Sequence, residues 1–364
     1  MTEAIYFDNA CTTYPKPEEV AQAVYAYITQ VGSNVNRSSY GRAYGAEEMV
    51  YDARERLCRF FGGSDCRNVV FTKNVTESLN ILLKGFLKPG DHVITTSMEH
   101  NAVMRPLTQL SRQGVAFSRA WCREDGSLPP GALEKCLRPN TRALVMTHAS
   151  NVCGTILPVE EAGAFCRAHG LRFFVDAAQT GGTVPIHMQE MHIDALAFTG
   201  HKGLLGPQGI GGFILGEDMP MELEPLLSGG TGSVSHKEEM PDFMPDRFEA
   251  GTLNLPGIAG LCAGLDWLEK TGIHRIARHE LDLTEQFLAG LNGLKARGLG
   301  IEILGKMGRE GRTGVVSIRT PGHGLAQTAA RLDEAYGIMT RAGAALRALC
   351  PPNPWNSSCG NHPL

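Results

Sequence analysis

The sequence has few of the features that mark membrane-spanning, secreted or nucleic-acid-binding proteins. None of its apolar runs approaches the roughly 18 residues that a membrane-spanning helix needs. Charged residues make up 20% of the chain and the net charge is −4, so no basic surface is predicted for nucleic acid or an anionic membrane. The first residues lack the charged and apolar regions of a signal peptide. We therefore expect a cytoplasmic protein whose main partner is a small molecule.

Cysteine and histidine occur, but not in redox or metal-binding patterns. The ten cysteines include no C-x-x-C pair, and the twelve histidines include no H-E-x-x-H spacing. In a cytosolic chain of 364 residues this argues against a disulfide framework and a zinc cluster. Most cysteines are predicted to be small core residues, and no bound metal is predicted.

Residues 171–202 carry the first positive signal. Two short apolar runs, 172–175 and 195–198, have the length of buried strands, and polar residues follow each of them. Ligands bind at strand ends in an open α/β sheet, so Asp176 and Lys202 are predicted to face one small molecule. Pyridoxal 5'-phosphate (PLP) requires a carboxylate beside its pyridine nitrogen and a lysine that forms a Schiff base. For either residue alone, the simpler interpretation is that Asp176 caps a helix and that Lys202 is a solvated loop lysine.

The same pattern recurs at other predicted strand ends. Strands at 68–72, 92–96 and 142–147 alternate with helical stretches, which predicts a mostly parallel sheet with right-handed crossovers. Thr76 is predicted to be the N-cap of a helix, where free backbone N–H groups can bind an anion. His100 could stack on a pyridine ring, although a lone histidine at a strand end is more often a cap or surface residue. Asn151 could donate to a phenolic oxygen. The polar groups expected at this one edge are Thr76, His100, Asn151, Asp176, Gln179, His201 and Lys202.

The rest of the chain predicts a second, smaller domain. Helices are expected at 18–29, 45–61, 258–269 (after a turn broken at Pro256) and 274–294, and strands at 300–304 and 315–319. Residues 32–44 read as a loop whose Asn36 and Arg37 are either solvated or part of a site rim. The irregular segment 217–245 is expected to cover a site or make an oligomer contact. We predict a large domain over residues 15–252 and a small domain made of 1–14 and 253–364.

Seven separate stretches, in order, resemble the cysteine desulfurase branch of the class V aminotransferase-like PLP enzymes. They are YFDNACTTYPKP, VTESLN, EHNAVMRP, SNVCGTI, VDAAQTGG, TGHKGLLGPQGIGG and RFEAGTLN, within about residues 4–343. The resemblance implies the fold of PLP-transferases of fold type I, with a mostly parallel sheet in the large domain and a smaller α+β domain. It also implies a homodimer, L-cysteine as substrate and a sulfur-acceptor protein as a further partner.

The resemblance implies a role for each polar residue of the predicted site. Lys202 would hold PLP as a Schiff base and take the α-proton of the substrate, Asp176 would pair with the ring nitrogen, and His100 would stack on the ring. Gln179 and Asn151 would bond the phenolic oxygen. The residues implied at the phosphate are Val75, Thr76, Thr199 and His201, with Thr252 reaching it from the partner subunit.

The C-terminal stretch departs from the family pattern. In this branch a loop cysteine, in a pattern like R-x-G-x-H-C-A, attacks the substrate sulfur and becomes a persulfide, and a later arginine holds the substrate carboxylate. Here residues 341–348 read RAGAALRA, Leu346 stands where the nucleophile belongs, and no arginine follows Arg347. The nearest thiol is Cys350, in an unfamiliar setting. Residues 342–364 are atypical, and this proline-rich tail is predicted to be disordered.

A frameshift near codon 343 would explain this departure. With one base removed, a compatible back-translation from Gly343 reads Gly-Leu-His-Cys-Ala-Pro-Phe-Ala and allows a later arginine. Resequencing the locus tests the hypothesis, because homogeneous reads of an unshifted gene would rule it out.

The sequence thus predicts a PLP-dependent, cysteine desulfurase-like enzyme that converts L-cysteine to alanine and a persulfide, with impaired sulfur transfer because leucine cannot attack sulfur. One alternative is a PLP-dependent C–S lyase or aminotransferase of the same fold, which needs Lys202 but no cysteine. Another is a non-catalytic PLP-binding remnant, and a last one is a chain of this fold without cofactor. Products separate the first two, since a lyase yields pyruvate and a desulfurase yields alanine.

Overall fold

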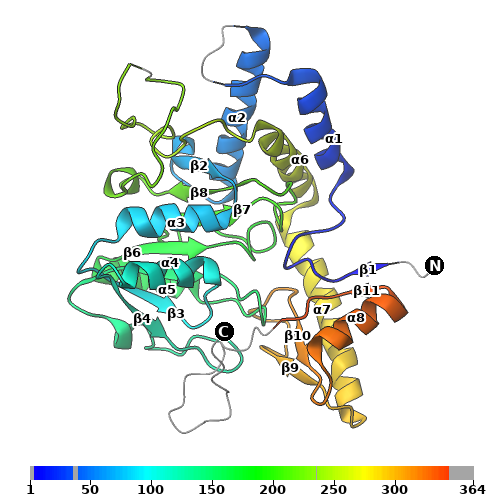
Figure 1. Cartoon of the computed structure of the whole chain (residues 1–364). Coiled ribbons are helices and arrows are strands. Elements are labelled where there is room, and N and C mark those ends of the chain that lie inside the picture. The colour runs from blue at the N-terminus through cyan, green and yellow to red at the C-terminus, as the bar shows by residue number, and fades with distance from the viewer. Residues whose placement is uncertain (1–3, 36–39, 235, 344–364) are drawn as a thin grey trace.

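The computed structural model describes residues 4–35, 40–234 and 236–343, and its centre is a seven-stranded sheet (Figure 1). The strand order is β2-β8-β7-β6-β5-β3-β4. The strands are β2 (Val69–Thr72), β3 (His92–Thr96), β4 (Ala116–Ala120), β5 (Thr141–Thr147), β6 (Arg172–Asp176), β7 (Ala195–Thr199) and β8 (Gly211–Leu215). Only β8 runs antiparallel to its neighbours, β2 and β7. The predicted α/β fold with a mostly parallel sheet is confirmed.

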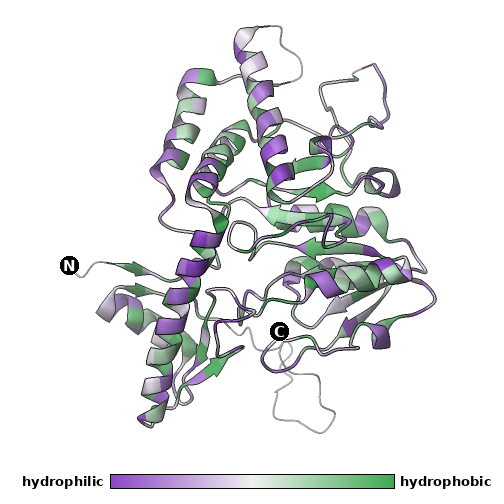
Figure 2. Cartoon of the chain, turned by 180° about the vertical axis from the view of Figure 1, so that it is seen from behind, coloured by the Kyte–Doolittle hydropathy of each residue, from purple (hydrophilic) through white to green (hydrophobic). Residues whose placement is uncertain are grey.

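Both faces of this sheet are covered by helices, which explains why its strands read as continuous apolar runs. The adjacent residues Phe173 and Phe174 of β6 are both fully buried, yet they belong to separate cores on opposite faces. One core packs against α2 (Gly41–Phe60), α5 (Val159–His169) and α6 (Leu255–Thr271). The other packs against α3 (Val75–Phe86) and α4 (Asn101–Ser111), which lie on the near side of the sheet in Figure 1. Seen from behind, the strands are mainly hydrophobic in colour (Figure 2).

A second group of elements is joined to the sheet by α7 (Ile273–Ala296), which continues from α6 (Figure 1). It holds an antiparallel pair, β9 (Glu302–Leu304) and β10 (Ser317–Arg319), and α8 (Leu325–Tyr336). The N-terminal strand β1 (Ile5–Tyr6) pairs in parallel with β11 (Ile338–Met339). The first residues of the chain therefore lie with its C-terminal part. The division into two domains at residues 14 and 252 stays a prediction.

Several predicted boundaries differ from the observed ones. The helix predicted from residue 45 begins at Gly41, inside the predicted loop 32–44. The first helix, α1 (Glu18–Ala26), ends earlier than predicted and passes into a π-helical turn, Tyr27–Val31. Pro256 does not break the chain but lies in the first turn of α6, where a missing N–H costs no helical hydrogen bond. The elements α8 and β11 had no sequence prediction.

Some predictions fall on residues that lie outside the described part of the chain. They concern Asn36 and Arg37, and also Leu346, Arg347, Cys350 and the tail that follows. Within the described part, no helix is both long and apolar enough to cross a membrane.

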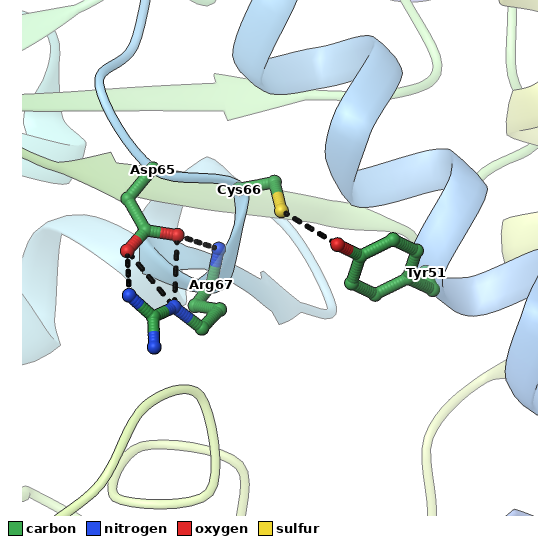
Figure 3. Close-up of polar contacts among 4 residues, drawn as sticks. All are labelled: Tyr51, Asp65, Cys66 and Arg67. Atoms are coloured by element: carbon green, nitrogen blue, oxygen red, sulfur yellow. Dashed lines mark hydrogen bonds and ion pairs between the residues drawn. The ribbon is translucent and has the colours of Figure 1, made fainter.

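The eight cysteines of the described residues are all free, and four of them are only half-buried. One of these, Cys66, lies in the turn that enters β2 (Figure 3). Asp65 caps this turn by accepting a hydrogen bond from the backbone N–H of Arg67 at 2.9 Å, and the two side chains form an ion pair. The Cys66 thiol donates to the hydroxyl of Tyr51 in α2 at 3.7 Å. Cys66 is thus a structural contact at the edge of the sheet where β2 begins.

Candidate active site

The ends of β6 and β7 place the predicted acid and lysine at one edge of the sheet. Asp176 is the last residue of β6 and pairs in register with Ala197 of the neighbouring strand β7. The turn from β7 to β8 is too short for a crossover helix, so β8 returns antiparallel and the turn with Lys202 stays at this edge. Gly182, after β6, packs so closely on this turn that a Cβ there would overlap with the Gly203 carbonyl oxygen.

Asp176 and Lys202 are close enough for each to change the pKa of the other. Asp176 is 2% exposed and accepts a hydrogen bond from the backbone N–H of Ala178 at 2.9 Å. Burial raises the pKa of Asp176, and the charges of Lys202 and His100 oppose this shift. Burial lowers the pKa of Lys202, and the charge of Asp176 opposes it. The predicted juxtaposition of acid and lysine is therefore present.

His100 serves as a helix cap and also faces this pair. It precedes α4, and its Nδ1 accepts a hydrogen bond from the backbone N–H of Ala102 at 3.1 Å. Burial lowers the pKa of His100; the charge of Asp176 opposes this shift and that of Lys202 adds to it. Because Nδ1 accepts this hydrogen bond, the neutral form of the ring carries its proton on Nε2. The simpler cap interpretation is correct, but it does not exclude the functional one.

Two buried polar atoms beside Lys202 have no hydrogen-bond partner. Among the described residues, Thr199 Oγ1 and His201 Nδ1 are two of only four such side-chain atoms. Burial, together with the charges of Lys202 and Lys16, lowers the pKa of His201 to about 4, so its ring is neutral. An unpaired buried polar atom costs about 1–3 kcal/mol, so both atoms favour a polar ligand between the turn and the sheet. They fit the phosphate predicted at this position.

The first turn of α3 completes this edge, but its cap is not the predicted one. Asn74 is the N-cap, and its side chain accepts a hydrogen bond from the backbone N–H of Glu77 at 3.0 Å. Thr76 lies inside the first helical turn, after Val75, and is exposed. The prediction that Thr76 caps this helix is wrong, because Asn is as good a cap as Thr and occupies the earlier position. The helix start still presents backbone N–H groups at this edge.

An arm from the N-terminus closes over the Lys202 turn, which sequence reasoning missed. Gln179 Nε2 donates to the carbonyl oxygen of Ala10 at 3.0 Å. The carbonyl oxygen of His201 accepts from Thr12 Oγ1 at 3.2 Å, from the Thr13 N–H at 3.1 Å and from Lys16 Nζ at 2.9 Å. We refer to residues 10–16 as the arm. The run of small polar residues in DNACTT is the sequence signal that could have indicated it.

Glu99 is a second buried carboxylate of the site that was not predicted. It accepts hydrogen bonds from Thr96 Oγ1 at 2.6 Å and from the Thr147 N–H at 2.9 Å, so it joins the ends of β3 and β5. Burial raises its pKa to about 8, and the negative charge of Asp176 adds to the shift. Glu99 directly precedes His100 at a predicted strand end, and this position could have indicated from the sequence that it belongs to the site.

Two further predicted site residues, Asn151 and Thr252, differ in where the structure places them. Asn151 is half-buried in the turn after β5. Thr252 is exposed and lines a separate cavity of about 270 Å³ together with Asn34 and Gly230.

A larger cavity, about 720 Å³, opens at the opposite edge of the sheet, where Arg172 is paired with Asp194 and Glu222. Nowhere in the described ranges do three His, Cys, Asp or Glu side chains form a group that could hold a metal ion.

Glu99 predicts a pH dependence of stability for the protein free of cofactor. Its pKa rises from 4.5 to about 8 on folding, so the folded state holds the proton more tightly. The protonated Glu99 therefore contributes fully to the free energy of unfolding below pH 4.5, and this contribution is lost as the pH rises toward 8. Each unit by which folding raises the pKa corresponds to about 1.4 kcal/mol. Urea unfolding at pH 5 and pH 8 is expected to show a smaller loss in Glu99→Gln than in the unchanged protein. An equal loss of stability in Glu99→Gln and in the unchanged protein would contradict a raised pKa at Glu99. Glu124→Gln, at an exposed position, is the control.

Comparison with known proteins places this geometry in a family. The model of the family described as "Aminotransferase class-V" matches residues 5–350. A "Probable cysteine desulfurase" of Methanothermobacter thermautotrophicus is 34% identical over 347 residues, which cover 94% of this chain and 84% of that protein.

Solved structures agree with this comparison. The apo structure of the cysteine desulfurase from Thermococcus onnurineus NA1 matches with a TM-score of 0.87 and 32% identity, over 95% of this chain and 87% of the other. A structure titled "SspA in complex with cysteine" matches with a TM-score of 0.64 and 28% identity, over 72% of each chain.

Proposed function

The chain belongs to the aminotransferase class-V family, and on this premise we propose that it acts as a PLP-dependent, cysteine desulfurase-like enzyme on L-cysteine. Enzymes of this kind depend on PLP, and when bound, PLP withdraws electrons from the α-carbon of an amino-acid substrate. The observation that carries the proposal is the pair of unpaired polar atoms, Thr199 Oγ1 and His201 Nδ1, in the segment that contains Lys202. The charge of the buried Asp176 acts on the same lysine and raises its pKa against the effect of burial. The similar structure titled "SspA in complex with cysteine" supports L-cysteine as the proposed substrate.

Each residue at this edge has a distinct proposed task. Lys202 binds the cofactor covalently and then takes the α-proton, for which its lowered pKa suits it because a neutral amine is the active form. Asp176, kept from water, holds a proton on the cofactor's ring nitrogen. His100 stacks on the ring. The residues proposed for the phosphate are Val75, Thr76, Thr199 and His201, and those for the phenolic oxygen are Asn151 and Gln179.

Arg341 is a described cation that could bind the substrate carboxylate. It follows β11, and its charge is among the influences that lower the pKa values of both Lys202 and His100, after burial in each case. A guanidinium within reach of both groups suits the carboxylate of an amino acid bound between them. We therefore propose this role for Arg341.

Product analysis tests the proposed function. Purified protein loaded with PLP is given L-cysteine and a thiol reductant, and alanine, sulfide and pyruvate are measured together. Alanine and sulfide in equal amounts are expected for a desulfurase. Pyruvate in place of alanine would instead support the C–S lyase, which the leucine at position 346 favours because a lyase needs no nucleophilic cysteine. Bound PLP with neither product would support a non-catalytic remnant.

We further propose that the protein is a homodimer in which Thr252 completes the phosphate site of the partner subunit. Within one chain Thr252 is exposed and lines a cavity in which Lys202 takes no part. An exposed aromatic and aliphatic set on and around α1 and α2 suits a second copy of the chain. Its members are Tyr25, Ile28, Tyr40, Tyr44 and Tyr51. A sulfur-acceptor protein and a cytoplasmic location are proposed on the sequence expectations alone, and pull-down and cell fractionation would test them.

Subunit mixing tests the shared site. Lys202→Ala and Thr252→Ala are each expected to lose most activity as separate homodimers. After unfolding and refolding together, half of the dimers are mixed and each contains one intact site, so about a quarter of the original activity should return. No recovery, although mixed dimers have formed, would mean that Thr252 acts within its own chain or not at all.

A further inference from the structure

Cys11 lies on the arm that closes over the Lys202 turn. Its neighbours on both sides are fixed there: the Ala10 carbonyl oxygen accepts from Gln179 at 3.0 Å, and Thr12 Oγ1 donates to the His201 carbonyl oxygen at 3.2 Å. Cys11 itself is half-buried, and its backbone N–H donates to the carbonyl oxygen of Asp8 at 3.0 Å. Its position relative to the Lys202 turn is therefore set by hydrogen bonds on either side.

The thiol is within electrostatic reach of the reacting lysine. Burial lowers the pKa of Lys202, and Asp176 first and then Cys11 oppose this shift. Cys122 and Cys262 are held as neutral thiols, since burial raises the pKa of Cys122 to about 11 and of Cys262 to about 12. Cys66 is engaged with Tyr51 at the opposite edge of the sheet (Figure 3).

A ligand is expected at the Lys202 turn, on which the arm lies, for an independent reason. Thr199 is only 3% exposed, its Oγ1 has no partner, and it lies in the same segment as His201, to which the arm is bonded. A cofactor held by these groups brings the side chain of its amino-acid substrate to the Lys202 turn that the arm covers.

We propose that Cys11 is the thiol that takes the sulfur atom of L-cysteine in this chain, in place of the loop cysteine whose position Leu346 occupies. The inference rests on the proposed function. In the corresponding step, the Cys11 thiolate attacks the substrate sulfur, an S–S bond forms and the C–S bond breaks. The electron pair of the C–S bond passes to the β-carbon, which takes a proton and becomes the methyl group of alanine. The thiol is oxidised to a persulfide and the carbon is reduced, so no further oxidant is needed.

Persulfide mapping on the unchanged protein tests the proposal first. PLP-loaded protein is mixed with L-cysteine without reductant, free thiols and persulfides are alkylated, and proteolytic peptides are weighed. The peptide with Cys11 is expected to gain the mass of one sulfur atom. The same gain on the peptide with Cys350, and none on Cys11, would overturn the inference while leaving the desulfurase function intact. Absence of both alanine and any persulfide would overturn the proposed function, and this inference with it.

A matched pair of variants adds a kinetic test. Cys11→Ser is expected to keep the visible absorbance of lysine-bound PLP but to lower alanine formation in a single turnover by about 100-fold or more, because a hydroxyl cannot replace the positioned thiol. Cys66→Ser makes the same chemical change at a half-buried cysteine of the opposite edge and is expected to keep full activity. Equal activity of Cys11→Ser and Cys66→Ser, with PLP bound to both, would refute a role for Cys11.

Discussion

Lys202→Ala is expected to remove the visible absorbance of lysine-bound PLP and to lower alanine formation by at least about 10⁴-fold. The variant loses both the covalent attachment of the cofactor and the base that takes the α-proton, and a positioned base alone contributes about 10²–10⁴-fold. Folding should not suffer, because burial of Lys202 lowers its pKa and its charged form therefore destabilises the native state. Absorbance spectra, turnover and urea unfolding measure the three effects.

The exposed lysine at the end of α3 provides the control for this variant. Lys88→Ala removes an ammonium group just after the C-terminal end of α3, whereas Val75 and Thr76 of the proposed site lie in its first turn, and it is expected to keep both absorbance and activity. Retention of lysine-bound PLP in Lys202→Ala would show that another lysine, such as Lys16 of the arm, holds the cofactor. That result would contradict the proposed PLP site at the sheet edge formed by the ends of β6 and β7.

Asp176→Asn is expected to separate activity from stability. The amide keeps an oxygen that can accept from the Ala178 N–H, so the local backbone should be unchanged. It cannot hold a proton on the ring nitrogen, and we expect turnover to fall by about 10²–10⁴-fold with PLP still bound, a loss typical of one positioned acid–base group. The spectrum of the bound cofactor and the rate of alanine formation report these two properties.

The same variant is expected to stabilise the protein free of cofactor. Burial raises the pKa of Asp176 in the folded state, so folded protein binds the proton more tightly than unfolded protein. Its contribution to stability is therefore present at low pH and is lost as the pH rises through the folded pKa. At neutral pH the asparagine variant avoids this loss, and its urea midpoint should exceed that of the unchanged protein. A lower midpoint at neutral pH would mean that ionised Asp176 is favourably paired without the cofactor.

Local patterns determined much of this protein from sequence alone. Strands buried on both faces produce unbroken apolar runs, and Phe173 with Phe174 show why, since neighbours on one strand fill different cores. Parallel strands carry their polar ends to a common edge, which is why Asp176 and Lys202 could be paired without any contact information. The family assignment followed from the same short motifs.

Only the tertiary structure decided what depends on contacts between distant segments. The polar run in DNACTT could have indicated the arm, but its contacts are made through the backbone carbonyl oxygens of His201 and Ala10, and only the packing of distant segments decides which carbonyl oxygens are met. The choice of Asn74 over Thr76 as cap depended on where the helix begins, because both residue types are good N-caps. Glu99 and Cys11 acquire their significance from burial and from the charges around them. Sequence periodicity reports which face of an element is buried, whereas the partners across a site are set by how separate elements pack.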